Sequence, residues 1–234
     1  MSQQTVDIEV VRYAPDAFDW QQLPPPPEDT NPPGEETVLF RSADGNMSCG
    51  FWRRVPERGR LAPPFDEIMQ ILEGEVDIHQ GDDTVHLGAG DILSAPNGAD
   101  AIWDAHSPVF KFWSVFQGEA SPGARVTTIH PKEGLRWQEA SIPPDDGYEA
   151  GREVVAFERG PFSCGLWERD QQDRDFERPF DEAAVILEGE IEITTVEGRT
   201  LLAGPRDVVI TPKGSRGHWK SLRPVRKFWA IYES

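Results

Sequence analysis

The chain has 234 residues, of which 41 are acidic and 23 are basic, so its formal net charge is −18. A field of this sign repels phosphate backbones and anionic lipid headgroups, which argues against nucleic-acid and membrane-surface partners. Hydrophobic residues make up 38% of the chain, including eight Trp and twelve Phe, which is enough for packed cores. The sequence shows no signal-peptide pattern and no apolar run near the roughly 18 residues that span a bilayer. We therefore expect a cytoplasmic protein.

Residues 1–35 begin with the alternating run Val6–Tyr13 and end in two proline-rich runs at 23–27 and 31–34. Proline lacks a backbone donor and favours extended polyproline structure, so these runs do not belong in the centre of a sheet. A related segment recurs at 124–140. We interpret both segments as arms that lie over a surface or link larger units.

The strongest signal in the sequence is an internal repeat. Residues 64–78 recur as residues 179–193, shifted by 115 positions with no gap. In each copy an apolar run, a Glu-Gly pair and a second alternating run predict a β-hairpin. Glu67 and Glu182 stand where the first strand begins. Because side chains alternate along a strand, these glutamates and Met69 are predicted to point inward.

The eight tryptophans also repeat between the two halves of the chain, at separations of 115 to 117 residues. The pairs are Trp20/Trp137, Trp52/Trp167, Trp103/Trp219 and Trp113/Trp229. Turn signals follow one another at roughly 8–12-residue intervals, as in barrels and sandwiches of short strands. A solenoid needs at least about three repeats, so two copies indicate a duplicated β-unit. The expected boundaries are an N-terminal strand and arm at 1–35, a first barrel at 36–118, a connecting arm at 119–150 and a second barrel at 151–234.

The spacing of glutamate, glycine and proline resembles that of the cupin superfamily, whose motifs are G-x5-H-x-H-x3/4-E-x6-G and G-x5-P-x-G-x2-H. The matching positions are Glu67, Gly74, Gly90, Pro96 and Gly98 in the first copy, and Glu182, Gly189, Pro212 and Gly214 in the second. Arg206 replaces the leading glycine of the second motif in the second copy. The Asp-Glu start and the Leu-Glu-Gly-Glu turn are similar, more narrowly, to the (S)-ureidoglycine aminohydrolase-type cupins. The resemblance implies an all-β fold of two tandem jelly-roll (double-stranded β-helix) barrels.

The usual metal ligands of this superfamily are missing from both copies. The resemblance implies a first-row metal held by three histidines and one glutamate. The histidine positions are occupied by Leu61, Pro63 and Ala101 in the first copy and by Phe176, Arg178 and Gly217 in the second. We therefore predict no cofactor, and a non-standard divalent metal at one of the glutamates is the alternative that stays open.

The candidate catalytic residues are Glu182 and Glu67, as general bases, although a structural role through hydrogen bonds fits their pattern equally well. Arg178 stands four residues before Glu182. It would pair with that carboxylate, hold a substrate carboxylate in a bidentate fork, or lie solvated at the barrel rim. The other candidate ligand-binding residues are Phe176, Trp219, His218, Trp103 and Met69.

Strand parity separates two of these candidates. His218 has the opposite parity to Gly217 and is expected to face outward, whereas Trp219 shares the inward parity. Lys111 and Lys227 repeat between the copies and are expected to form structural ion pairs. With Arg178, the second barrel offers more polar capacity and more room, so we expect a working site there.

The leading hypothesis is a bicupin that binds a small, carboxylated organic molecule in one barrel. The alternative is an enzyme resembling ureidoglycine aminohydrolase, which would hydrolyse an amide nitrogen of a ureido compound. A third hypothesis is that one barrel only supports the other. The expected partner is a small molecule, and the resemblance makes a homodimer plausible.

Overall fold

The computed structural model describes residues 7–22, 34–131, 135–139 and 149–234. Almost all regular structure in these residues is β-strand, and the only helical element among them is the 3-10 turn η1 (Pro15–Ala17). This part of the chain therefore contains no helix with the length and apolar character needed to cross a membrane. The proline-rich runs at 23–33 lie outside the described residues.

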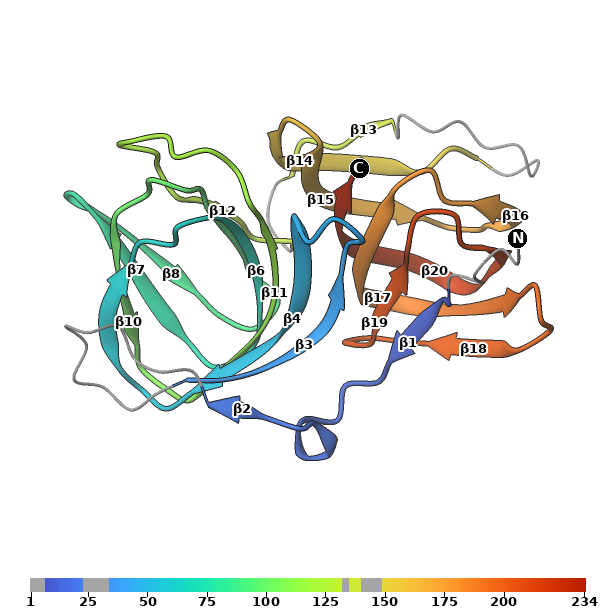
Figure 1. The fold of residues 1–234 in the computed structure, drawn as a ribbon, viewed down its shortest axis with the longest axis horizontal. Coiled ribbons are helices and arrows are strands. Elements are labelled where there is room, and N and C mark those ends of the chain that lie inside the picture. The colour runs from blue at the N-terminus through green and yellow to red at the C-terminus, as the bar shows by residue number, and fades with distance from the viewer. Residues whose placement is uncertain (1–6, 23–33, 132–134, 140–148) are drawn as a thin grey trace. The chain divides into compact units, whose positions relative to one another are not determined.

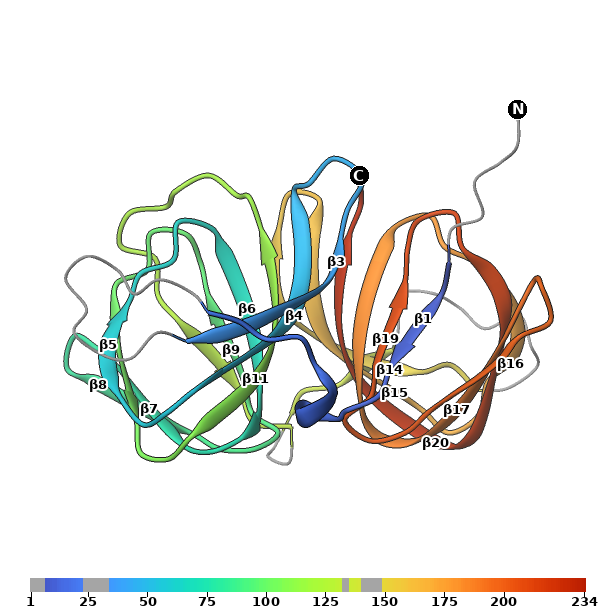
Figure 2. The same cartoon turned by 60° about the horizontal axis from the view of Figure 1, so that its bottom comes forward.

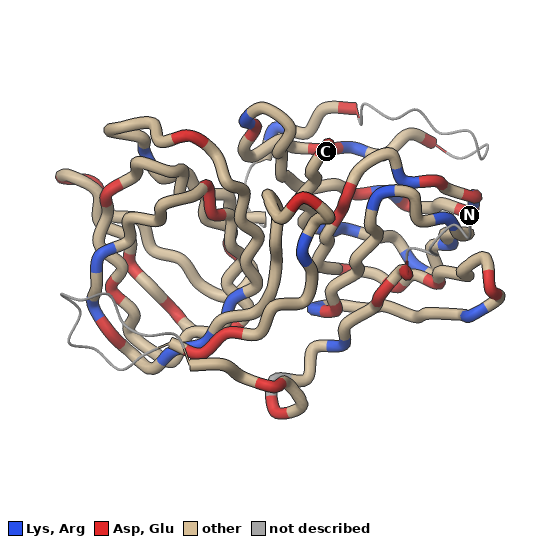
Figure 3. Tube along the Cα trace, viewed as in Figure 1, with Lys and Arg blue, Asp and Glu red and all other residues tan. Residues whose placement is uncertain are grey.

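The chain divides into two compact units, shown in Figure 1. The first, called the N-terminal barrel, contains Pro15–Glu133. The second, called the C-terminal barrel, contains Met1–Ala14 together with Gly134–Ser234. Acidic residues are spread over the strands and loops of both barrels, as expected from the net charge (Figure 3). The prediction of two all-β barrels is confirmed.

The N-terminal barrel encloses its hydrophobic core between two sheets. Its strands are β2 (Gln21–Gln22), β3 (Glu35–Arg41), β4 (Met47–Arg54), β5 (Arg58–Leu61), β6 (Asp66–Glu73), β7 (Val76–Gln80), β8 (Asp83–Leu87), β9 (Ile92–Ala95), β10 (Ala101–Ala105), β11 (Val109–Phe116) and β12 (Thr127–Ile129). One sheet has the order β12-β9-β6-β11-β4-β3-β2 and the other has the order β5-β10-β7-β8. Inward residues from both sheets form the core, among them Met69, Ile78 and Trp103.

The C-terminal barrel is one continuous nine-stranded sheet. Its strands are β1 (Glu9–Val11), β13 (Gln138–Glu139), β14 (Arg152–Arg159), β15 (Phe162–Arg169), β16 (Asp173–Glu177), β17 (Asp181–Thr195), β18 (Thr200–Ala203), β19 (Val208–Thr211) and β20 (Arg216–Tyr232). The main path is β1-β19-β17-β20-β15-β14-β13, with β16 on β20 and β18 on β17. The long strands β17 and β20 correspond to the pairs β6–β7 and β10–β11 of the N-terminal barrel.

The predicted Glu-Gly hairpin is wrong, because the two runs that flank it do not pair with each other. β6 pairs with β9 and β11, whereas β7 pairs with β8 and β10 in the other sheet. Gly74 has φ of 92° and Gly189 has φ of 88°, and a Cβ at either glycine would collide with the carbonyl oxygen of Pro108 or Pro224. The glycines therefore mark a corner where the chain turns from one side of the barrel to the other.

The N-terminal segment completes the edge of the C-terminal barrel. β1 pairs with β19, with Glu9 opposite Ile210 and Val11 opposite Val208 (Figure 2). Ile8, just before β1, is 3% exposed and belongs to the core of that barrel. In the N-terminal barrel the equivalent edge is occupied by β12, which pairs with β9. The two related segments, 1–35 and 124–140, therefore each contribute a strand at the edge of a sheet, β1 and β12, as expected for segments that do not form a sheet centre.

Replacing Ile8 by Ala should destabilise the C-terminal barrel by about 2–4 kcal/mol, because it leaves a cavity in a closed core. The measurement is urea unfolding, combined with amide exchange in β19. Glu9→Ala, at the next and exposed position, is the control and should change stability by less than about 0.5 kcal/mol. Equal, small effects of the two substitutions would show that β1 does not hold the barrel edge.

Candidate functional site

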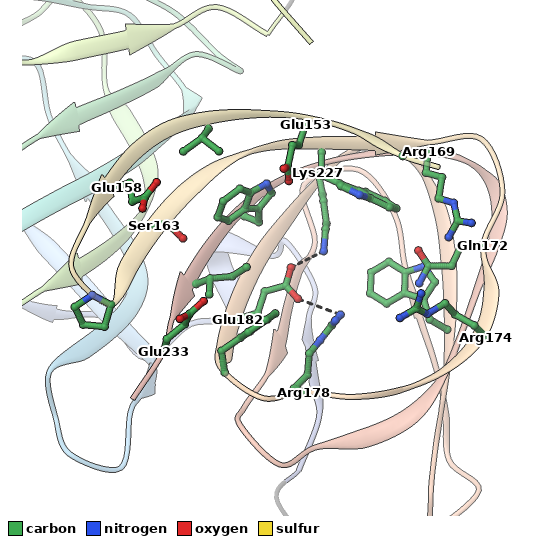
Figure 4. Close-up of a pocket in the computed structure, with 18 of the residues that line it drawn as sticks. Glu153, Glu158, Ser163, Arg169, Gln172, Arg174, Arg178, Glu182, Lys227 and Glu233 are labelled. Atoms are coloured by element: carbon green, nitrogen blue, oxygen red, sulfur yellow. Dashed lines mark hydrogen bonds and ion pairs between the residues drawn. The ribbon is translucent and has the colours of Figure 1, made fainter. Parts of the chain in front are cut away.

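A cavity of about 440 Å³ opens in the C-terminal barrel. It is lined by side chains from β14, β15, β16, β17 and β20, which Figure 4 draws as sticks. Glu182 and Lys227 point into it from the two central strands, and Arg178 points into it from the segment before β17. This cavity therefore brings together charged groups that are far apart in the sequence.

Arg178, Glu182 and Lys227 form a buried cluster, called the charge triad below. The Lys227 ammonium donates to Glu182 Oε1, and Arg178 Nη2 lies 3.0 Å from Glu182 Oε2 (Figure 4). Arg178 Nε also donates to Thr211 Oγ1 at 3.1 Å. The side chains of Glu182, Lys227 and Arg178 are only 5%, 10% and 15% exposed. With one carboxylate and two cations, the triad carries one net positive charge inside the barrel.

The close contacts within the triad shift the pKa values of Glu182 and Lys227. Burial alone would raise the pKa of Glu182, but the nearby Arg178 and Lys227 cations outweigh it and lower that pKa to about 2. Burial also lowers the pKa of Lys227, and the like charge of Arg178 lowers it further, against the opposing effect of Glu182. Glu182 is therefore ionised at neutral pH, and Lys227 loses its proton more readily than an exposed lysine does.

Aromatic rings surround both cations of the triad. Lys227 Nζ lies 5.2 Å from the ring centroids of both Trp167 and Trp219. Arg178 Cζ lies 4.7 Å from the centroid of Phe176. Such contacts stabilise desolvated cations by about 0.5–2 kcal/mol each. Trp219 Nε1 is buried and finds no acceptor among the described residues, so it remains available as a donor.

The N-terminal barrel has a simpler version of this arrangement. Lys111 Nζ donates to Glu67 Oε1 at 2.8 Å and to Met69 Sδ at 3.4 Å. It lies 4.8 Å and 5.2 Å from the centroids of Trp52 and Trp103. The pair is neutral overall, because Pro63 stands where the C-terminal barrel has Arg178.

Three of the candidate residues, Glu182, Arg178 and Trp219, line the cavity together. Phe176 packs in the same barrel core and supports Arg178. Glu67, Met69 and Trp103 lie in the N-terminal barrel and are not among the residues that line this cavity.

His218 does not line the cavity, in contrast to its inclusion among the candidate ligand-binding residues. Its Nε2 lies 2.7 Å from Asp173 and its Nδ1 lies 2.8 Å from Asp175, and its side chain is 39% exposed. The physical reason is that side chains alternate between the two faces of β20, so Trp219 points into the barrel and His218 points out of it.

Four residues that line the cavity were not predicted to belong to the site: Lys227, Trp167, Gln172 and Arg174. For Lys227 a signal was present, because it recurs as Lys111 with inward parity in both copies. Arg174 and Gln172 belong to β16 and the turn before it, where no repeated pattern marks them.

Two jelly-roll barrels in tandem, each with an inward glutamate at the start of a central strand, define a bicupin. The chain belongs to the EutQ-like cupin domain family, which matches residues 41–113 and 157–229. Each matched range contains one copy of the internal repeat. No curated protein is significantly similar to this chain in sequence.

Solved structures share the fold at low sequence identity. A protein of unknown function from Pseudomonas syringae pv. tomato str. DC3000, of the DUF861 family, has a TM-score of 0.77 at 20% identity, covering 98% of this chain and 100% of that chain. Ylba from E. coli, also of DUF861, has a TM-score of 0.66 at 9% identity, with coverages of 99% and 94%. A salicylate 1,2-dioxygenase from Pseudaminobacter salicylatoxidans has a TM-score of 0.60 at 14% identity, with coverages of 84% and 76%. These similarities establish the fold alone.

The residues at the superfamily's metal position do not fit a first-row metal ion. Glu182 already faces two cations, which would repel a divalent ion. At Gly217, a Cβ would lie 3.3 Å from Ile8 Cδ1 and 3.4 Å from Phe176 Cε1, so the space of a histidine ligand is filled. Among the described residues, no three His, Cys, Asp or Glu side chains are placed to hold a metal.

The low pKa of Glu182 gives the protein a specific sensitivity to acid. Its folded-state pKa of about 2 lies below the ordinary value of 4.5, so ionised Glu182 stabilises the fold above about pH 4.5. This contribution disappears as the pH falls toward 2, and it amounts to about 3 kcal/mol. Unfolding free energies measured from neutral to acid pH should therefore fall less steeply for Glu182→Gln than for the wild type. Parallel curves for the two proteins would contradict this assignment.

Proposed function

We infer that the C-terminal barrel binds a small organic carboxylate in its cavity. The net positive charge of the triad is the observation that supports this function most directly. Arg169 and Arg174, and also Glu153, Glu158 and Glu233, line the rest of the cavity, so the excess cation is local to the triad. A ligand carboxylate bound beside Arg178 would pair with that local charge. Arg178 Nε and Nη2 already contact Thr211 Oγ1 and Glu182 Oε2, so a ligand carboxylate would be met by the remaining N–H donors of the guanidinium, at Nη1 and Nη2.

The dimensions and lining of the cavity suit a small molecule. Ligand sites usually occupy about 300–1,000 Å³, with apolar walls and a few convergent polar groups, and this cavity has about 440 Å³. Trp167 and Trp219 supply flat apolar walls beside the triad. Arg174 and Gln172 lie on the Arg178 side of the cavity, where they add polar donors (Figure 4).

The comparison with the N-terminal barrel adds support from within the same chain. There the carboxylate and the lysine neutralise each other, and Met69 contacts the ammonium. The position equivalent to Met69 is Ala184, whose side chain is smaller. The glutamate–lysine pair of the N-terminal barrel thus lacks the excess charge and has a bulkier neighbour in Met69, which is consistent with a supporting role.

The alternative is an amide-nitrogen hydrolase that resembles ureidoglycine aminohydrolase. Glu182 would then act as a base or as a ligand of a rebuilt metal site. Either role requires that Glu182 be released from Arg178 and Lys227, so this alternative has less support than carboxylate binding. Ammonia release from ureidoglycine by the purified protein is the direct assay.

Carboxylate binding is tested by titration calorimetry with pyruvate, lactate, malonate and benzoate. Wild-type protein should bind at least one of them, and Arg178→Met should weaken that binding by about 10–100-fold through the loss of a charge-assisted hydrogen bond. Ala184→Met should abolish binding, because it copies the side chain that fills the N-terminal barrel. The matched control is Met69→Ala, which should leave binding unchanged. Absence of binding to all four compounds, or wild-type affinity in both C-terminal variants, would exclude the proposed site.

A further inference from the structure

Lys227 is a buried amine that opens into the cavity, in contact with Glu182 and next to Arg178. We propose that Lys227 is a nucleophile that forms an imine with the carbonyl group of a small 2-oxo acid. This activity rests on the proposed function, because Arg178 must first hold the carboxylate of the same ligand.

The geometry of the triad matches the geometry of a 2-oxo acid. Lys227 and Arg178 contact the two oxygens of one carboxyl group, that of Glu182, so the amine and the guanidinium are separated by the width of one carboxylate (Figure 4). In a 2-oxo acid the carbonyl carbon is bonded directly to the carboxylate carbon. A ligand whose carboxylate pairs with Arg178 therefore presents its carbonyl carbon to Lys227.

The surroundings of Lys227 also favour its reactivity. Nucleophilic lysines are found desolvated in apolar pockets or next to another cation. Lys227 is buried and shares the Glu182 carboxylate with a second cation, Arg178. Burial and the charge of Arg178 lower the pKa of Lys227, which increases the fraction of free amine at neutral pH. The Trp167 and Trp219 rings lie beside the amine, with their centroids 5.2 Å from Nζ.

The reaction is balanced without any redox partner. The nitrogen lone pair forms the C–N bond, the carbonyl π pair moves to oxygen, and the C–O bond then breaks as the C=N bond forms. Counted from the ammonium form, two protons of nitrogen leave with that oxygen as water, and the third stays on the imine nitrogen. The positive charge is conserved, so ionised Glu182 pairs with the iminium as it paired with the ammonium.

Lys111 supplies an internal control. It is also a buried lysine that contacts a glutamate between two tryptophans. It lacks a neighbouring arginine at the equivalent of position 178, and Met69 lies against its Nζ. Lys111 should therefore not react, although it shares most of the local environment of Lys227.

The experiment is reductive trapping on the wild-type protein. Protein is incubated with pyruvate, glyoxylate or 2-oxoglutarate and sodium cyanoborohydride, then digested and mapped by mass spectrometry. At least one oxo acid should label Lys227 about tenfold or more above Lys111 and the exposed Lys213, because a held ligand reacts at a raised effective concentration. Excess lactate, which has the carboxylate but no carbonyl, should suppress this labelling. Arg178→Met should lower it.

The outcomes separate this activity from the proposed function. Binding of a carboxylate in calorimetry without preferential labelling of Lys227 would overturn the imine and leave carboxylate binding intact. Equal labelling of Lys227, Lys111 and Lys213, or labelling that lactate does not suppress, would also overturn it. Absence of both binding and labelling would overturn both.

Discussion

Each barrel of this bicupin buries a carboxylate, and the pairing of that carboxylate with a lysine on the neighbouring central strand is the interaction on which the interior depends. Glu67 pairs with Lys111 across β6 and β11, and Glu182 pairs with Lys227 across β17 and β20. Removing one partner of such a pair typically costs about 3–5 kcal/mol, because the other charge stays buried without compensation. Both barrels therefore retain the glutamate–lysine pair, and neither residue can be replaced alone without a large loss of stability.

The duplication allowed the two interiors to diverge around this shared pair. In the N-terminal barrel, Met69 and Pro63 leave the lysine and the carboxylate as a closed, neutral unit. In the C-terminal barrel, Arg178 adds a second cation and Thr211 accepts a hydrogen bond from it. A small number of side chains thus separates a packed core from a charged cavity, while the backbone of the barrel is retained.

Much of the fold followed from patterns that are local or repeated. The duplication, the turn spacing and the cupin-like motifs predicted two β-barrels, and strand alternation placed Met69 and Trp219 inside. The Glu-Gly segments were misinterpreted, because alternating runs on either side of a turn look the same in a hairpin and in a barrel corner. The difference is made by Pro108 and Pro224, whose carbonyls pass close to the glycines from distant parts of the sequence.

The candidate site was predictable only in part, because some of its contacts also join distant parts of the sequence. The proximity of Arg178 and Glu182 could be anticipated, since they are four residues apart. Lys227 is 45 residues from Glu182 in the sequence, and only the register of β17 against β20 brings the two together. The volume of the cavity beside them could not be predicted, because cavities depend on how all the surrounding side chains pack.

The edge position of β1 has a consequence for how the protein is made. Glu9 is synthesised about 200 residues before its partner Ile210. The N-terminal barrel has its strands from Pro15–Glu133 alone and is available for folding during synthesis. The C-terminal barrel cannot close before β19 and β20 have been synthesised. Only then can β1 pair with β19, so β1 has no sheet partner until that point. Its assembly is therefore dominated by non-local pairing, which is slow compared with local pairing, and it is the part of the chain most exposed to misassociation with other nascent chains.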